Sequence, residues 1–255
     1  GWKAVFWLFG VIGVLLGVLW FKFVPDNPKQ SPYVNEAELE HINDGRENTV
    51  EAKEIAPWGK LLKSSQFWSL GLQFMITDYI MYVFLAWLPL YLMEVHGFSL
   101  SKMGLWAAAP WLSLMAVVSC CGYLSDKAIA AGFSQNLVKT STGAVGILLC
   151  ACTLFIATRT ADPMMNVFWL SVALGSLGLT MSASWSSVIS MGGRFAGSVS
   201  GWMNFWGNIG GVLAPSVTAW VATTYGWQAA LAVTAVSGIA GAVLWLFVKP
   251  DKAIV

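Results

Sequence analysis

Long apolar stretches separated by short polar segments dominate this sequence. Seven of them, each 19 residues or longer, cover residues 5–23, 67–92, 103–123, 138–158, 164–191, 195–222 and 227–248. At about 1.5 Å rise per residue, a helix of roughly 20 residues crosses the ~30 Å hydrocarbon core of a bilayer. The chain is 57% hydrophobic and 11% charged, as lipid requires, because nothing there solvates a charge or an unpaired amide. We therefore predict an all-α transmembrane protein with seven spans.

The spacing of the stretches predicts four parts: a first span (1–24), a polar connector (25–65), a bundle of six spans (66–248) and a tail (249–255). In the connector, Asn35 followed three residues later by Glu38 predicts the N-cap of a short helix that continues to about Ile42. Residues 58–65 are amphipathic, which fits either a helix lying in the membrane interface or a lead-in turn. The short connections in the last part predict an antiparallel helical bundle.

Positive charge favours one side of the membrane. Of the 14 basic residues, 11 fall in alternate connections: Lys22, Lys29, Arg46, Lys53, Lys60, Lys63, Lys127, Lys139, Arg194, Lys249 and Lys252. The other side keeps Lys3, Lys102 and Arg159. By the positive-inside rule, the connector and the C-terminus are predicted to be cytoplasmic. The formal net charge of +1 gives no support for nucleic-acid binding.

The sequence predicts no metal, cofactor or enzyme chemistry. Cys120, Cys121, Cys150 and Cys152 all lie within predicted spans, and the two histidines, His41 and His96, lie in connections between spans. A metal or redox site needs thiolates in a polar pocket with further ligands, so we interpret the cysteines as small packing residues. The glycine clusters lack the strand–helix setting of a phosphate-binding loop.

Two groups of residues resemble a known family. Gly122, Asp126 and Lys127 are similar to the repeated Gly-x-x-x-Asp-Arg/Lys loop of the major facilitator superfamily, with Lys in place of Arg. One span, a connector and six further spans resemble the sixth to twelfth helices of that superfamily. The resemblance implies that these three residues form a latch that breaks and reforms as two halves of the protein rock. Physically, the glycine permits close helix contact and the aspartate can cap a neighbouring helix.

A second motif is more specific. The segment from Arg194 through Gly197, Gly201, Gly207 and Gly211 to Pro215 resembles the eleventh helix of the anion:cation symporter branch. This branch includes sialin, the vesicular glutamate transporters and bacterial hexuronate, galactonate and glucarate carriers. The glycines at four-residue spacing also permit tight helix packing, and Pro215 removes a backbone hydrogen bond, which favours a kink.

Asp78 is the only charged residue deep within a predicted span. Burying an unpaired carboxylate costs free energy, so this group must be protonated, paired or in contact with water. Asp78 is therefore our candidate for coupling to protons or another cation. The alternative is a neutral carboxyl group that only donates a structural hydrogen bond.

Polar side chains within three spans are candidates for substrate binding. The resemblance implies that a Ser–Trp cluster of the tenth helix lines the cavity, and Ser184 and Trp185 occupy that stretch. Asn204 and Asn208 share one helix face, which should look into the protein interior. Amide, hydroxyl and indole groups can bond sugar-acid hydroxyls and carboxylates without adding charge. The full candidate set is Gln73, Tyr79, Tyr82, Ser184, Trp185, Asn204 and Asn208; the alternative for the serines is bonding to their own helix.

The resemblance implies the C-terminal half of a secondary transporter that moves an organic anion, such as a sugar acid, with proton or sodium coupling. The expected partners are the N-terminal half, the lipid bilayer and the anion, and the expected location is a bacterial inner membrane. Because the chain opens with Gly1, we expect a fragment or a processed product. The alternative function is an accessory subunit that docks onto a larger membrane complex without transporting anything.

The predicted topology can be tested by cysteine labelling. Single cysteines introduced near Arg46 and near Val255 should react with a membrane-impermeant reagent only from the cytoplasmic side, because an even number of predicted crossings separates them. A cysteine near Lys102 should react only from the opposite side. Labelling of the two cytoplasmic positions from different sides would contradict the predicted orientation.

Overall fold

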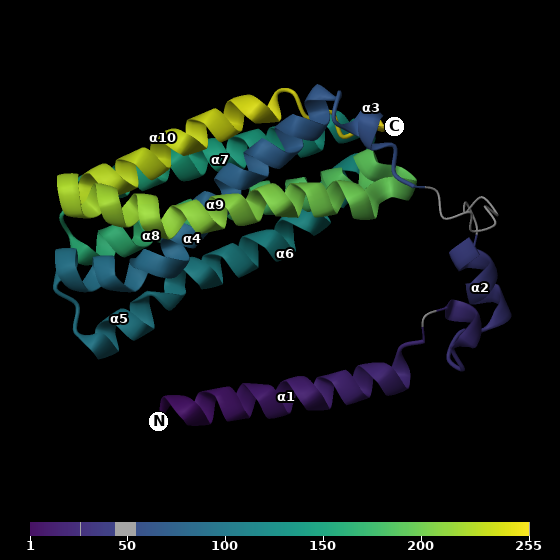
Figure 1. Cartoon of the computed structure of the whole chain (residues 1–255), viewed down its shortest axis with the longest axis horizontal. Coiled ribbons are helices and arrows are strands. Elements are labelled where there is room, and N and C mark those ends of the chain that lie inside the picture. Colours follow the sequence, from purple (N-terminus) through teal and green to yellow (C-terminus); the bar gives the residue numbers. More distant parts are fainter. Residues whose placement is uncertain (26, 44–54, 255) are drawn as a thin grey trace. The chain divides into compact units, whose positions relative to one another are not determined.

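The computed structural model describes residues 1–25, 27–43 and 55–254. Every regular element within these ranges is a helix, which confirms the all-α prediction (Figure 1). The elements are α1 (Trp2–Phe23), η1 (Pro28–Gln30), α2 (Glu36–Asn43), α3 (Trp58–Leu61), α4 (Ser65–His96), α5 (Leu100–Trp106), α6 (Ala108–Ala130), α7 (Gln135–Arg159), α8 (Pro163–Gly192), η2 (Gly193–Phe195), α9 (Ala196–Tyr225) and α10 (Trp227–Trp245). Arg46, Lys53 and Val255, which enter the topology prediction, lie outside the described residues.

The chain forms two compact units, Gly1–Ile55 and Ala56–Val255. In the first unit, α1 is 22 residues long and has no buried residue. The backbone N–H of Glu38 donates to Asn35 Oδ1 over 2.8 Å at the start of α2, which confirms the predicted N-cap. In the second unit, the amphipathic segment forms the four-residue helix α3, with Leu61 fully buried and Trp58 exposed.

Six helical segments are long and apolar enough to cross a membrane, by length and composition, among the described residues. The number is six because the 63-residue run Pro163–Tyr225 counts as one segment. This run contains α8 and α9, 30 residues each, and η2 between them, where Gly193 has a φ of +48°. The count of seven spans therefore stays a prediction.

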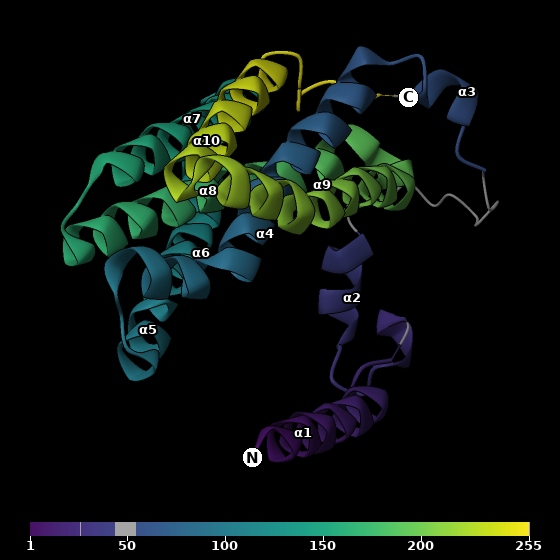
Figure 2. The same cartoon turned by 60° about the vertical axis from the view of Figure 1, so that its left-hand side comes forward.

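Contacts between side chains show how α8 and α9 run. Gln73 of α4 bonds Ser184, and Tyr91 of α4 bonds Asn166, so α8 is antiparallel to α4. Along the contact between α9 and α4, the residue numbers of both helices increase in the same direction: Trp202 lies beside Phe67, and Gly211 lies beside Tyr82. The helix α9 is therefore parallel to α4. The helices α8 and α9 therefore run in opposite directions, as Figures 1 and 2 also show.

The predicted stretch 103–123 forms two helices rather than one. The helix α5 ends at Trp106 and α6 begins at Ala108. Pro110 has no N–H group to donate to the carbonyl of Trp106, so one helical hydrogen bond is missing at this point and the helix is interrupted. The two helices still count as one 31-residue segment, Leu100–Ala130, that is long and apolar enough to cross a membrane, so the predicted span is kept although its helix is interrupted at Ala107.

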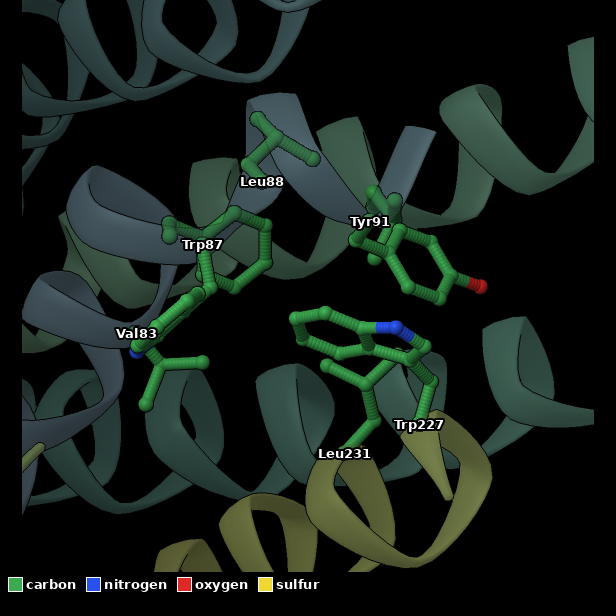
Figure 3. A pocket seen from close by; sticks show the side chains of 8 residues that line it. Val83, Trp87, Leu88, Tyr91, Trp227 and Leu231 are labelled. Carbon is green, nitrogen blue, oxygen red and sulfur yellow. The ribbon is translucent and has the colours of Figure 1, made fainter. Parts of the chain in front are cut away.

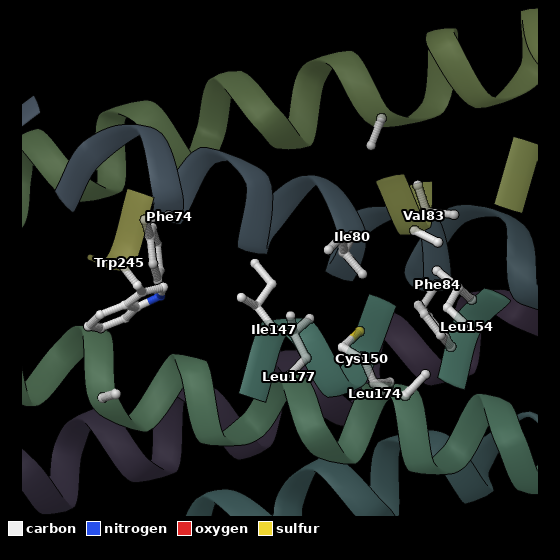
Figure 4. Packing of buried hydrophobic residues seen from close by; sticks show 14 of the residues in the cluster. Phe74, Ile80, Val83, Phe84, Ile147, Cys150, Leu154, Leu174, Leu177 and Trp245 are labelled. Carbon is white, nitrogen blue, oxygen red and sulfur yellow. The ribbon is translucent and has the colours of Figure 1, made fainter. Parts of the chain in front are cut away.

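The core lies where α4, α7, α8 and α10 meet (Figure 4). Fully buried Ile80, Ile147, Leu174 and Leu177 pack there, and Trp245 of α10 lies against Gly143 of α7. The helices approach closely because small residues face their neighbours, as expected where lipid gives no hydrophobic drive for helix association.

One buried charge supports this core. Lys139 lies in the second turn of α7, and only 9% of its surface is exposed. Its Nζ donates to the carbonyl of Ser186 and to Ser190 Oγ, both over 3.2 Å. The sequence analysis used Lys139 only as an indicator of orientation. The structure shows that its ammonium group also ties α7 to the last turns of α8.

The close contact at Gly146 predicts the effect of a substitution. A Cβ at this position would lie 2.7 Å from Thr180 Oγ1 and 2.9 Å from the backbone oxygen of Ser176. We expect Gly146→Ala to lower the free energy of unfolding in detergent by about 1–3 kcal/mol, because the α8 backbone must shift. Gly104→Ala is the matched control: nothing lies within 4 Å of it, and it should be neutral or stabilising by up to ~1 kcal/mol. Equal losses in both variants would contradict this account of the packing.

Candidate functional site

Three glycines allow α4 and α9 to lie in close contact. A Cβ at Gly210 would collide with the backbone carbonyl of Met75, and a Cβ at Gly211 would lie 3.0 Å from the ring of Tyr82. A Cβ at Gly207 would collide with the carboxylate of Asp78. The predicted tight packing is therefore confirmed for the Gly207/Gly211 pair, and Gly210 adds a third close contact. A Cβ at Gly197 or Gly201 would meet no heavy atom within 4 Å among the described residues, so tight packing is not seen at that pair.

Asp78 lies buried in this contact. Only 6% of its surface is exposed, and Phe74, one turn earlier, shares the same face of α4 against Gly207. Among the described residues, Asp78 has neither a hydrogen-bond partner nor a basic side chain within 4 Å. An ionised carboxylate in such surroundings is costly, so it needs a proton or a cation for neutralisation. The alternative, a carboxyl group that donates a structural hydrogen bond, has no described acceptor.

A buried polar cluster joins α4 to α8. Gln73 Nε2 donates to Ser184 Oγ over 3.1 Å and to the carbonyl of Leu70 over 3.1 Å. Thr77, which the sequence analysis missed, donates to the carbonyl of Gln73 over 3.0 Å. Gln73, Thr77 and Ser184 are all fully buried. The i to i+4 spacing of Gln73 and Thr77 was the signal that could have revealed the threonine.

Trp185 and the two asparagines lie on the surface of the chain. The Trp185 side chain is 42% exposed and packs edge-on against Phe74, with 5.8 Å between the ring centroids. Asn204 and Asn208 are exposed, and Asn208 Nδ2 donates to the carbonyl of Asn204 over 2.8 Å. The expectation that both asparagines face the interior is wrong within this chain. At about 100° per residue, they lie beside Gly207 at the edge of the α4–α9 contact.

The other predicted residues lie apart from the buried polar cluster of Gln73, Thr77 and Ser184. Tyr79 and Tyr82 are half-buried and pack against the core. Gly122, Asp126 and Lys127 lie in the last turns of α6 rather than in a loop. A Cβ at Gly122 would meet no heavy atom of another helix within 4 Å among the described residues, so the expected close helix contact is absent there. The latch role stays a prediction.

A second polar cluster, which the sequence analysis missed, lies at the C-terminal end of α4. Asn166 Nδ2 donates to Tyr91 OH over 3.0 Å and to the carbonyl of Ala157 over 2.8 Å. Tyr91 OH lies 3.3 Å from His96 Nε2. His96 was placed in a connection, but it is the last residue of α4, which ends at the left-handed Gly97. The available sequence signal was an asparagine inside the apolar stretch 164–191, and the structure shows that Asn166 is fully buried.

Tyr91 and Trp227 also line a small apolar pocket with Val83, Trp87 and Leu231 (Figure 3). Its volume of about 10 Å³ is close to the space for one water molecule. The lining offers no polar group for a substrate to bond, so we assign this pocket to packing. The candidate site is instead the α4–α8–α9 contact around Gln73, Asp78 and Ser184.

Comparison with known proteins identifies the family. The Major Facilitator Superfamily profile matches residues 1–215. The chain belongs to this superfamily, whose members are transporters and not enzymes. It is an integral membrane protein.

The curated relatives are named as carriers of anions and sugar acids. The chain is 27% identical over 99% of its length to a chloroplastic ascorbate transporter of Arabidopsis thaliana. It is 28% identical over 98% of its length to a D-galactonate transporter of Escherichia coli, and 29% over 100% to a probable galactarate/D-glucarate transporter of Bacillus subtilis. The chain spans 47%, 60% and 58% of these three proteins, respectively.

A solved structure shares the fold. A bacterial homologue of the human drug peptide transporters aligns with a TM-score of 0.56 and 16% identity, over 73% of this chain and 44% of that one. At this identity the likeness concerns the fold alone. It supports the all-helical fold.

The hydrogen bond between Gln73 and Ser184 can be tested by a double-mutant cycle. Ser184→Ala should lower the free energy of unfolding by about 1–3 kcal/mol, because it leaves a buried amide N–H without an acceptor. In the Gln73→Leu background, Ser184→Ala should lower the free energy of unfolding by less. The coupling free energy between the two substitutions should be at least ~0.5 kcal/mol. Ser176→Ala is the matched control, because Ser176 is buried in the same helix and donates only to the carbonyl of Val172. Additive effects of the two cluster variants would contradict a direct bond.

Proposed function

We propose that this chain is the C-terminal half of a secondary active transporter for an organic anion, of the sugar-acid or related carboxylate class. The observation that carries the proposal is the match to relatives that are named as transporters of ascorbate, galactonate, and galactarate or glucarate. The buried polar contact of α4 with α8 and α9 supports it. This contact supplies polar groups in the middle of an apolar bundle, where they are costly unless they have a use.

The proposed binding groups are neutral. Ser184 and Gln73 supply a hydroxyl and an amide next to each other, and Trp185 supplies an exposed indole. Asn204 and Asn208 add amides at the neighbouring edge of α9, and Tyr79 and Tyr82 add hydroxyls on α4. Such groups bond hydroxyls and carboxylate oxygens directionally, as the recognition of a polyhydroxylated acid requires.

Asp78 is the proposed coupling group. Its carboxyl group is buried against Gly207 and has no described basic partner, so binding of a proton or a sodium ion would remove an uncompensated charge. The neutralised state would favour closure of the contact, whereas the charged state would favour access to water. This difference in free energy links cation binding to the equilibrium between inward-open and outward-open states.

The proposed transport cycle uses alternating access and needs the N-terminal half as a partner. Two bundles rock about a site near the middle of the bilayer, and Gly122, Asp126 and Lys127 form a latch at the end of α6. The proposed setting is a bacterial inner membrane with the C-terminus in the cytoplasm. On this proposal, the chain alone binds lipid but does not transport.

Uptake assays test this function. The full-length protein that carries this chain should accumulate labelled D-galactonate or a related sugar acid in proteoliposomes against its concentration gradient. Asp78→Asn should abolish this accumulation but preserve substrate exchange, because exchange needs alternating access without net cation release. Asp251→Asn, which removes an exposed carboxylate of the tail, is the control and should behave as the unmodified protein.

Two results would contradict the proposal. Accumulation by the Asp78→Asn variant with unchanged pH and sodium dependence would remove Asp78 from the coupling step. Accumulation by this chain without any other half would contradict the division of the transporter into two halves.

A further inference from the structure

A second pocket lies at the end of the bundle where α4 and α7 finish and α10 begins. It has a volume of about 280 Å³, and its polar lining comes from His96, Thr158, Arg159, Thr160, Trp227 and Gln228. We call it the distal pocket. Its volume is close to the lower end of the range of about 300–1,000 Å³ typical of ligand pockets, so it has room for a small polar molecule.

Arg159 gives the distal pocket its positive charge. It is the last residue of α7, and its guanidinium lies over the ring of Phe155, 5.1 Å from the centroid. Among the described residues, no carboxylate lies within 4 Å of it. Its fork of N–H donors is therefore available to a carboxylate, which a guanidinium binds in bidentate fashion.

The two nearby acidic side chains are already engaged. Asp162 Oδ1 accepts from the backbone N–H of Met165 over 2.7 Å and caps α8. Glu94 Oε2 accepts from Trp227 Nε1 over 2.9 Å. Both acids are thus held in structural roles. The hydroxyl protons of Thr158 and Thr160 are donated to backbone carbonyls of α7, so the free donors of the pocket come mainly from Arg159 and Gln228.

His96 is held in place by its neighbours. Asn166 donates to the oxygen of Tyr91, so the Tyr91 hydroxyl proton is free to be donated to His96 Nε2, 3.3 Å away. When Tyr91 donates to Nε2, the neutral imidazole carries its proton on Nδ1, and His96 is then a further donor. The side chains of Thr160 and Gln228 add a hydroxyl and an amide suited to hydroxyl groups.

We propose that the distal pocket binds a small hydroxylated carboxylate, with Arg159 pairing the carboxylate and His96, Thr160 and Gln228 contacting the rest. The choice of a sugar acid as ligand rests on the proposed function, but the pocket does not depend on transport. It is separate from the candidate site around Gln73 and Ser184, which lies on another part of α4. The pocket would hold the anion at one end of the bundle before entry or after release.

Nuclear magnetic resonance of His96 reports on this pocket directly. The chain has two histidines, so His41→Gln in an untagged full-length protein leaves the ¹⁵N-imidazole signal of His96 as the single histidine signal of this chain. Titration with D-galactonate at fixed pH in lipid nanodiscs should move this signal saturably. Arg159→Gln should weaken the apparent affinity roughly tenfold or more, because it removes the charged donor.

The controls separate the pocket from general charge effects. Lys102→Gln is matched to Arg159→Gln, because Lys102 is exposed and its ammonium also lies over a phenylalanine ring, 4.4 Å from the Phe98 centroid. It should leave the titration unchanged. Galactitol, which has the hydroxyls but no carboxylate, should give no saturable movement.

Three outcomes overturn the proposal: no saturable movement of the His96 signal, an equal response in Arg159→Gln, or an equal response to galactitol. Uptake measured in parallel separates it from the proposed function. Loss of all sugar-acid uptake with an intact, Arg159-dependent His96 response would overturn the transport proposal alone. Uptake without any His96 response would overturn the distal pocket alone.

Discussion

The close contact between α4 and α9 is the constraint on which the rest of the candidate site depends. In lipid, helices gain little from hydrophobic association, so close van der Waals contact must hold them together. The absence of side chains at Gly207, Gly210 and Gly211 lets α4 lie against the α9 backbone. The same absence makes space for the carboxyl group of Asp78. Packing and candidate chemistry therefore rest on the same three glycines, and a larger residue there would disturb both.

Most hydroxyl groups in the bundle do not point to a function. Ser171, Ser176 and Thr153 each donate to a carbonyl of their own helix, which satisfies the group without a partner from outside. Bonds between helices are fewer and more informative. Those of Gln73 and Lys139 join α4 and α7, respectively, to α8, and mark the places where a polar group has been kept inside the bundle at a cost.

Local sequence patterns could predict the helices but not how they pair. The apolar stretches, the Asn35 cap and the isolated Asp78 were visible because each is a property of neighbouring residues. The bond between Gln73 and Ser184 joins positions 111 residues apart, and nothing local specifies it. The exposure of Asn204 and the place of His96 in the distal pocket likewise depend on which helix lies beside which. The break before α6 was predictable in principle, because Pro110 lacks a donor.

A missing backbone hydrogen bond separates the two groups of polar residues along α4, those around Asp78 and those around His96. Pro89 lies within α4 between Asp78 and His96, and it cannot donate to the carbonyl one turn earlier. Pro215 lies within α9, one turn beyond Gly211, which packs on Tyr82, so both missing bonds lie on the same side of Asp78. Two closely packed, parallel helices that lack a hydrogen bond in neighbouring turns bend there at lower cost than elsewhere. A bend at these prolines would therefore move the residues around His96 relative to those around Asp78 without disrupting the glycine contact, which lies on the Asp78 side of both prolines.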